Sequence, residues 1–141
     1  RKGRELVFRA LYESRLTGDP VGEVLELSLG KFRLTAEGRQ YALRLAESCA
    51  TLSGALDGEL QRLLQAWDPD RLGAVERAVL ELAFAELRRH RDVDAKVILD
   101  EAVRLAQRYV SPEAGAFVNG LLDPLARRER PGELEEVPPG A

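Results

Sequence analysis

The first sixteen residues place basic and aromatic side chains at helical spacing, a pattern that can bind single-stranded nucleic acid. If these residues form a helix with 100° per residue, one strip of its surface carries Arg1, Arg4, Phe8, Tyr12 and Arg15. Guanidinium groups bind phosphates through paired hydrogen bonds, and an aromatic ring offers a surface on which an unpaired base can stack. The same spacing also describes an ordinary solvated helix face with its two aromatic rings at the edge of the core. The residues of this strip leave both interpretations open.

Side chains suited to catalysis are scarce. The chain has one histidine, His90, and one cysteine, Cys49. His90 lies in the run LRRHR, where cations favour a helix C-terminus, and Cys49 falls in the apolar stripe of its helix, so we expect structural roles for both. Carboxylates such as Asp100 and Glu101 are adjacent and point to different helix faces. The sequence therefore predicts no enzymatic activity, no bound metal and no cofactor.

The composition is that of a globular protein with one basic end. The chain has 141 residues, of which 45% are hydrophobic and 32% charged, and its net charge is −3. The first sixteen residues nevertheless carry five basic side chains against two acidic ones. A single cysteine favours a reducing compartment, and no apolar run approaches the ~20 residues of a membrane span. We therefore expect a cytoplasmic protein.

The elements that position the basic strip are predicted to be helical throughout. Apolar residues recur at intervals of three and four, and no segment alternates with a period of two. Asp or Ser directly before proline predicts helix starts near Pro20, Pro69 and Pro112, and Thr35 is the expected cap of a further helix. We predict an all-α fold of about seven helices and no sheet.

The helical pattern ends near Arg128. The sequence that follows, ERPGELEEVPPGA, is dominated by proline, glycine and glutamate and can bury little apolar surface. We therefore predict a helical domain of residues 1–128 and a disordered tail of residues 129–141 that is dispensable for folding.

Several motifs in series resemble the NusB family of bacterial transcription antitermination factors. They are VERAVLELAFAEL at 75–87, DVDAKVILDEAVRLAQRY at 92–109 and FVNGLLD at 117–123, preceded by the basic opening RKGRE. The resemblance extends from Arg4 to Ala126, with the motifs in the family's order and spacing. It implies two packed helical bundles whose arginine-rich first helix contacts RNA.

The resemblance also implies a function and a set of site residues. It implies a complex with NusE, which is also a small-subunit ribosomal protein, and recognition of boxA-type RNA in ribosomal RNA leader transcripts. It further implies entry into the RNA polymerase antitermination complex. The implied RNA contacts are Arg1, Lys2 and Arg4 on phosphates, Tyr12 on a base, and Glu76 and Phe117 near the surface shared by RNA and partner. Glu113 and Phe117 are the implied partner contacts.

The FVNG segment and the proline after it carry three further predictions. We expect Gly120 to allow a close approach of two helices and Asn119 to bridge polar groups between them. Pro124 cannot donate a hydrogen bond to Gly120, so we expect it to kink the last helix or restart it with Asp123 as the cap.

Five positions depart from the family pattern. Asp94 replaces the usual proline and is expected to cap the following helix, whereas Asp100 replaces an amide. Glu81 stands where a cation is usual, and Ala114 and Ala116 replace a hydroxyl and a lysine. Apart from the change at Asp94, these departures concern the RNA and partner surface.

Two other functions also fit the residues. A helical adaptor that binds only proteins would carry the basic strip as a solvated face. A NusB-like domain also precedes the catalytic domain of some ribosomal RNA cytosine methyltransferases, which would need a Rossmann-like domain after Arg128. The preferred RNA sequence, and whether the free protein is a monomer or a homodimer, stay open.

Overall fold

The computed structural model describes residues 1–134, which form seven α-helices and one short 3-10 helix. In chain order these are α1 (Lys2–Thr17), α2 (Val21–Leu29), α3 (Ala36–Thr51), α4 (Ala55–Leu63), the 3-10 helix η1 (Pro69–Arg71), α5 (Ala74–Arg89), α6 (Ala95–Tyr109) and α7 (Ala114–Glu129). No strand occurs within residues 1–134, and the predicted all-α class is confirmed. No helix in this range is long and apolar enough to cross a membrane.

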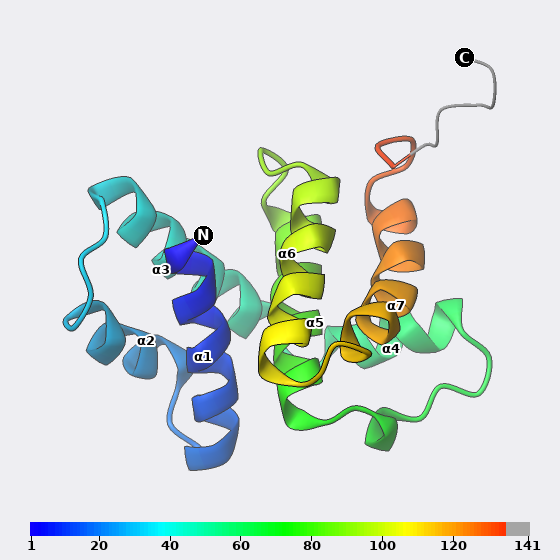
Figure 1. Ribbon diagram of the computed structural model, residues 1–141, viewed down its shortest axis with the longest axis horizontal. Coiled ribbons are helices and arrows are strands. Elements are labelled where there is room, and N and C mark those ends of the chain that lie inside the picture. Colours follow the sequence, from blue (N-terminus) through cyan, green and yellow to red (C-terminus); the bar gives the residue numbers. More distant parts are fainter. Residues whose placement is uncertain (135–141) are drawn as a thin grey trace.

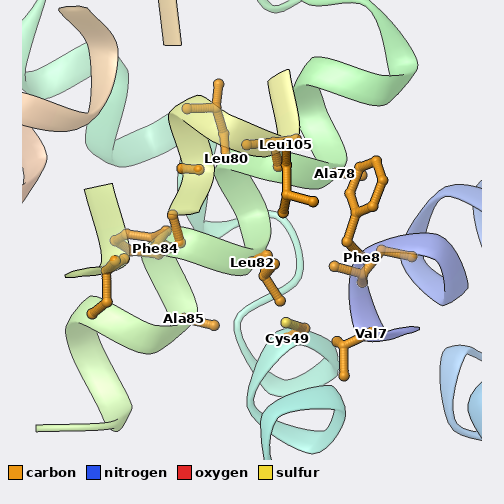
Figure 2. Close-up of a cluster of buried hydrophobic side chains, with 14 of the residues drawn as sticks. Val7, Phe8, Cys49, Ala78, Leu80, Leu82, Phe84, Ala85 and Leu105 are labelled. Atoms are coloured by element: carbon orange, nitrogen blue, oxygen red, sulfur yellow. The ribbon is translucent and has the colours of Figure 1, made fainter. Parts of the chain in front are cut away.

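The helices form two bundles that share one core (Figure 1). Helices α1, α2 and α3 pack on one another, α4 to α7 form the second bundle, and α1 and α3 both pack on α5. Figure 2 shows Val7 and Phe8 of α1 in the same buried cluster as Cys49 of α3 and Leu82 of α5. Cys49 is therefore a core residue as predicted, and burial raises the pKa of its thiol. Helix α5 joins the two bundles because its apolar residues pack against α1 and α3 as well as against α6 and α7.

Two of the predicted helix starts are confirmed closely. Helix α2 begins at Val21, directly after Pro20. Thr35 precedes α3, and its hydroxyl accepts a hydrogen bond from the Gly38 N–H at 2.9 Å. Both starts follow from local sequence, because proline and a capping hydroxyl act on the first turn of their own helix.

The other two prolines precede their helices by a longer interval than predicted. Pro69 begins η1, where the Asp68 side chain accepts a bond from a backbone N–H, and α5 starts only at Ala74. Helix α7 begins at Ala114, two residues after Pro112. In both places a turn closes before the helix begins.

Asn119 and Gly120 do not lie between helices, and this prediction is wrong. Both residues are exposed, and a Cβ added at Gly120 would meet no atom within 4 Å. The close approach of α6 and α7 occurs instead at Gly115, where an added Cβ would lie 3.0 Å from the Val103 side chain. Five residues correspond to about 140° around a helix, so Gly115 and Gly120 fall on different faces. The sequence analysis correctly expected a glycine at a close helix contact, but that glycine is Gly115 and not Gly120.

Helix α7 continues through Pro124 without interruption. The predicted restart with Asp123 as a cap is wrong, because Asp123 instead accepts a bond from Arg127 one turn later, at 2.9 Å. Proline removes the hydrogen bond to the Gly120 carbonyl. Gly120 is exposed, so solvent can replace that bond.

The segment after α7 packs against the helical domain. The Arg130 side chain is buried, with the residue 2% exposed. Its guanidinium donates at 2.6–3.0 Å to four backbone carbonyls at and after the end of α5, those of Glu86, Leu87, His90 and Val93. The last carbonyls of a helix lack partners within it, and a guanidinium has enough N–H groups to bind several of them. The predicted disordered tail is therefore wrong for residues 129–134, while residues 135–141 lie outside the described range.

The same segment also caps α6. Asp94 occupies the residue before the helix, but its side chain makes no capping hydrogen bond. The Ala95 N–H instead donates to Glu133 Oε1 at 2.8 Å, and this bond, together with the nearby Arg130, lowers the pKa of Glu133. The prediction that the Asp94 side chain caps α6 is wrong, because the cap comes from a residue distant in the sequence.

Candidate nucleic-acid interface

The strip of basic and aromatic residues on α1 faces the second bundle. Three of its arginines reach carboxylates on α5 and α6, in the pairs Arg1–Glu101, Arg4–Glu86 and Arg15–Glu81. Between them Phe8 is buried, with its ring centroid 5.0 Å from that of Tyr109 on α6. Most of the predicted RNA strip is therefore a contact between bundles.

Arg4 is the most deeply placed of these arginines. Its Nε and Nη2 atoms donate to the two carboxylate oxygens of Glu86 at 2.8 and 2.9 Å, and the two side chains are only 10% and 1% exposed. The Tyr41 hydroxyl donates to the same carboxylate. Burial alone would lower the pKa of Arg4, but the hydrogen bonds and charge of Glu86 raise it. Arg4 is therefore not placed to contact a phosphate, contrary to the prediction.

Arg1 and Arg15 remain closer to solvent. The Arg1 side chain is 69% exposed, and its guanidinium donates to Glu101 at 2.8 Å. Arg15 binds Glu81 at 2.6 Å, so the acidic residue that departs from the family pattern has a cation as its neighbour. Burial raises the pKa of Glu81, and the charge of Arg15 offsets part of that effect. Both arginines are neutralised in part by the second bundle.

Tyr12 lies at the edge of the strip and lines an open groove of about 490 Å³ between α1, the start of α5 and the end of α6. The other lining residues are Phe8, Arg9, Glu13, Leu16, Val75 and Tyr109. Leu16 is 65% exposed, and Tyr12, Val75 and Tyr109 are half-buried. The groove therefore presents aromatic and aliphatic surface to solvent.

Arg9 and Tyr109 are groove residues that the sequence analysis did not identify. Arg9 Nη2 donates to the Tyr109 hydroxyl at 2.9 Å, and this hydroxyl donates to Glu5 Oε1 at 2.7 Å. Burial tends to raise the pKa of Glu5, but the bond from Tyr109 and the charge of Arg108 hold it below its ordinary value. Arg9 lies three residues before Tyr12, which places both on one side of α1 and was the available sequence signal.

Lys2 lies at the opposite end of α1 from this groove. Its Nζ is 4.4 Å from the ring centroid of Phe32, which belongs to the loop between α2 and α3. Ten residues separate Lys2 from Tyr12, which corresponds to about 15 Å along the helix axis. The predicted RNA contacts of α1 thus divide into a basic end and an aromatic groove.

The remaining predicted site residues lie on other helices. Glu76 is half-buried in the first turn of α5, next to Val75 of the groove. Phe117 of α7 is half-buried against the core, and Glu113 is exposed immediately before α7. The structure therefore brings Glu76 close to the groove, whereas Phe117 and Glu113 are not among the groove's lining residues.

His90 ends α5 as expected, but its environment does not favour a cation. The residue is buried, and its Nε2 lies 2.9 Å from Ser48 Oγ. Burial lowers the pKa of His90, although the charges of Glu86 and Asp92 act in the other direction. A charged His90 that complements the helix dipole, as the sequence predicted, is therefore not favoured, and the neutral side chain contacts Ser48 instead.

Across residues 1–134, no three His, Cys, Asp or Glu side chains gather into a possible metal site.

Within residues 1–134, the geometry defines an all-helical protein of two bundles whose first helix borders an aromatic groove and begins with two cations, the exposed Arg1 and the half-buried Lys2. Residues 1–127 match the family model for NusB, and the chain belongs to the NusB family. The transcription antitermination protein NusB of Dictyoglomus thermophilum is 36% identical over 124 residues, which cover 88% of this chain and 81% of that protein. The resemblance seen in the sequence motifs is confirmed.

Solved structures support the same assignment. The structure of T. maritima NusB superposes with a TM-score of 0.80 at 31% identity, covering 89% of each chain. A NusB chain from a crystal structure of the antitermination factors NusB and NusE in complex with double-stranded RNA gives a TM-score of 0.78 at 29% identity. That match covers 89% of this chain and 94% of the other.

Proposed function

We propose that this protein is a transcription antitermination factor that binds boxA-type RNA together with NusE and joins the RNA polymerase antitermination complex. Family membership supports the class of function, and a structural neighbour is described as NusB with NusE and RNA. The observation that carries the proposal is the groove beside Tyr12. The protein acts by binding rather than by catalysis, in the cytoplasm where transcription takes place.

The groove suits an unpaired base. Tyr12 and Tyr109 supply half-buried rings, and Leu16 and Val75 extend the apolar surface around them. A base that stacks on such a ring gains roughly 1–3 kcal/mol with little dependence on its identity. Arg9 lies at the same groove and forms no ion pair within 4 Å in the described residues, although it donates to the Tyr109 hydroxyl and the charge of Glu5 acts on it. Its Nη1 group makes no hydrogen bond in the described residues and would be the group that contacts a phosphate.

The backbone of the RNA would be bound by the basic end of α1. Lys2 and the exposed guanidinium of Arg1 lie there, about 15 Å from Tyr12. The net charge of −3 opposes RNA binding at long range, so we expect weak binding by the free protein. NusE would strengthen binding by adding surface of its own.

The partner surface is proposed on α7 and the start of α5. Glu113 and Phe117 are its predicted residues, and Glu76 was predicted near the surface that RNA and partner share. If the free protein forms a homodimer, the same surface is the expected contact. Light scattering of the free protein and of its mixture with NusE distinguishes these states.

Filter binding of a boxA-like RNA, with and without NusE, tests the proposal. Tyr12→Ala should weaken binding by roughly 1–3 kcal/mol in the NusE complex, and Tyr12→Phe should retain most of the affinity because the ring remains. Leu27→Ala is the matched control, since Leu27 is an exposed apolar residue of α2 outside the groove.

A second candidate function is a helical adaptor that binds only proteins. The pairing of Arg4 and Arg15 with carboxylates favours it, because these cations hold the two bundles together. An adaptor would bind NusE but no RNA, in either the wild-type or the Tyr12→Ala form, and that result would overturn the proposed function.

A further inference from the structure

We propose that the loop between α2 and α3 forms a second RNA-binding surface, which holds nucleotides of the same single strand beyond the groove. This α2–α3 surface consists of Lys31, Phe32 and Arg33 together with Lys2 of α1. The inference rests on the proposed function, and it assigns RNA contacts to three residues that the sequence motifs do not indicate.

The cations of the α2–α3 surface form no ion pair within 4 Å in residues 1–134. Lys31 and Arg33 are exposed, and neither they nor Lys2 form an ion pair within 4 Å in the described residues. The acidic residues closest in sequence to Lys31 and Arg33 are Glu26, which lies 3.9 Å from Arg39, and Glu37 in the first turn of α3. Glu5 is closest in sequence to Lys2, whose charge helps to lower the pKa of Glu5 without forming an ion pair within 4 Å. Arg4 and Arg15, by contrast, bind carboxylates of the second bundle. The surface therefore keeps positive charge that an RNA backbone can use.

Phe32 adds an aromatic platform to these charges. The residue is 40% exposed, although a phenylalanine is ordinarily buried. Lys2 Nζ lies 4.4 Å from its ring centroid, a cation–π contact that holds the ammonium group beside the ring. A base can stack on the open part of the ring while Lys2, Lys31 and Arg33 contact the adjoining phosphates. Alternating aromatic rings and cations is the arrangement by which proteins bind single strands.

The position of the loop is fixed relative to α1. A Cβ added at Gly3 would lie 3.1 Å from the Gly38 carbonyl oxygen, so the starts of α1 and α3 are in close contact. Figure 1 shows the N-terminus of the chain beside α3, near the loop that leads into it. A strand that follows α1 from the groove to its N-terminal end therefore arrives at the α2–α3 surface, about 15 Å from Tyr12.

The test compares RNAs of different length on the complex with NusE. A short boxA-like RNA is measured beside two RNAs extended by about six nucleotides at the 5′ or the 3′ end, a length within the usual site size for single strands. One of the extended RNAs should bind wild-type protein more tightly than the short RNA. For that RNA, Lys31→Ala with Arg33→Ala should flatten the slope of log affinity against log salt by about 1.4.

Phe32→Ala should act differently from the charge variant. It should weaken binding of the extended RNA by roughly 5- to 150-fold, which is the loss of one stacked base, and leave the salt slope unchanged. Arg89→Ala with Arg91→Ala is the matched control, since it removes two exposed cations near the end of α5 that form no ion pair within 4 Å. This control should behave as wild type.

The results separate the two proposals. If wild-type protein gains nothing from either extension and the loop variants bind as wild type does, the α2–α3 surface is not an RNA site and the groove proposal stands. If wild-type protein with NusE binds none of the RNAs, both proposals fail. If the loop variants lose NusE binding in the absence of RNA, the surface binds protein and the inference is overturned.

Discussion

The basic residues of α1 have two kinds of partner. On the side that faces α5, Arg4 and Arg15 bind carboxylates. Elsewhere Lys2 lies over the Phe32 ring and Arg9 binds the Tyr109 hydroxyl. Arg4 pairs with a buried carboxylate and Arg15 with a half-buried one, and both pairs hold α1 to α5. Lys2 and Arg9 form no ion pair within 4 Å in the described residues, and we propose that their charges contact a ligand. The residues of the neighbouring helices decide which purpose each basic residue serves.

Among the basic residues of α1, Arg4 is expected to contribute most to the free energy of unfolding. Arg4→Ala leaves the Glu86 carboxylate buried with Tyr41 as its remaining side-chain partner. Removing one member of a buried ion pair costs about 3–5 kcal/mol, so urea unfolding should show a loss of that size. Arg4→Gln combined with Glu86→Gln should recover most of it, because no unpaired charge remains. An Arg4→Ala protein as stable as wild type would contradict the structural role of Arg4.

Arg130 should show the next largest effect, as an arginine buried outside α1. Arg130→Ala leaves the Leu87 carbonyl without its side-chain donor, while the Glu86 carbonyl keeps its bond from the His90 N–H, and we expect a loss of about 2–3 kcal/mol in the free energy of unfolding. Arg128→Ala is the control, since its side chain is exposed and lies 3.6 Å from Glu59. Equal stability of the two variants would show that the segment after α7 does not support the fold.

Acid should weaken the Arg1 contact between α1 and α6. Burial tends to raise the pKa of Glu101, but hydrogen bonds from Arg104 and Arg1 hold it below its ordinary value of 4.5. The stability from these bonds is fully present above pH 4.5 and is lost as the pH falls through the lower pKa of the folded state. Between pH 6 and pH 2, wild type should lose about 1 kcal/mol more than Glu101→Gln. Asp100→Asn, a change at an exposed neighbour, should follow wild type.

Arg15 should show the smallest effect. Arg15→Ala removes a partly exposed ion pair, and the expected change in the free energy of unfolding is about 0–1 kcal/mol at neutral pH. Because burial raises the pKa of Glu81, this carboxyl is protonated at a higher pH than an ordinary glutamate. At acid pH the difference in stability between wild type and Arg15→Ala should therefore disappear. A loss comparable with that of Arg4→Ala would mean that exposure does not distinguish the two pairs.

The fold followed from the sequence wherever local rules were sufficient. Proline before α2, the Thr35 cap and the apolar stripe that includes Cys49 each act within one helix, and all three are confirmed. Gly115 and Arg130 show the limit of such rules. Their roles depend on side chains and carbonyls from other helices, which helical spacing in one segment does not reveal.

The candidate site was predicted in part for the same reason. Projection of α1 grouped Tyr12 with Arg4, but it could not show that Glu86 lies opposite Arg4 while the groove opens beside Tyr12. Arg9 and Tyr109 were missed because they meet only when α1 packs on α6. Helical spacing therefore predicts which basic residues share one face of α1. The packing of the other helices decides which of these residues a ligand can reach.

The salt dependence of RNA binding by the NusE complex tests the division on α1 most directly. Each phosphate contact with a single strand contributes about −0.7 to the slope of log affinity against log salt. Lys2→Ala should flatten the slope by about that amount, whereas the Arg4→Gln, Glu86→Gln double variant should keep the wild-type slope. A flattened slope in the double variant, with an unchanged slope in Lys2→Ala, would contradict the account.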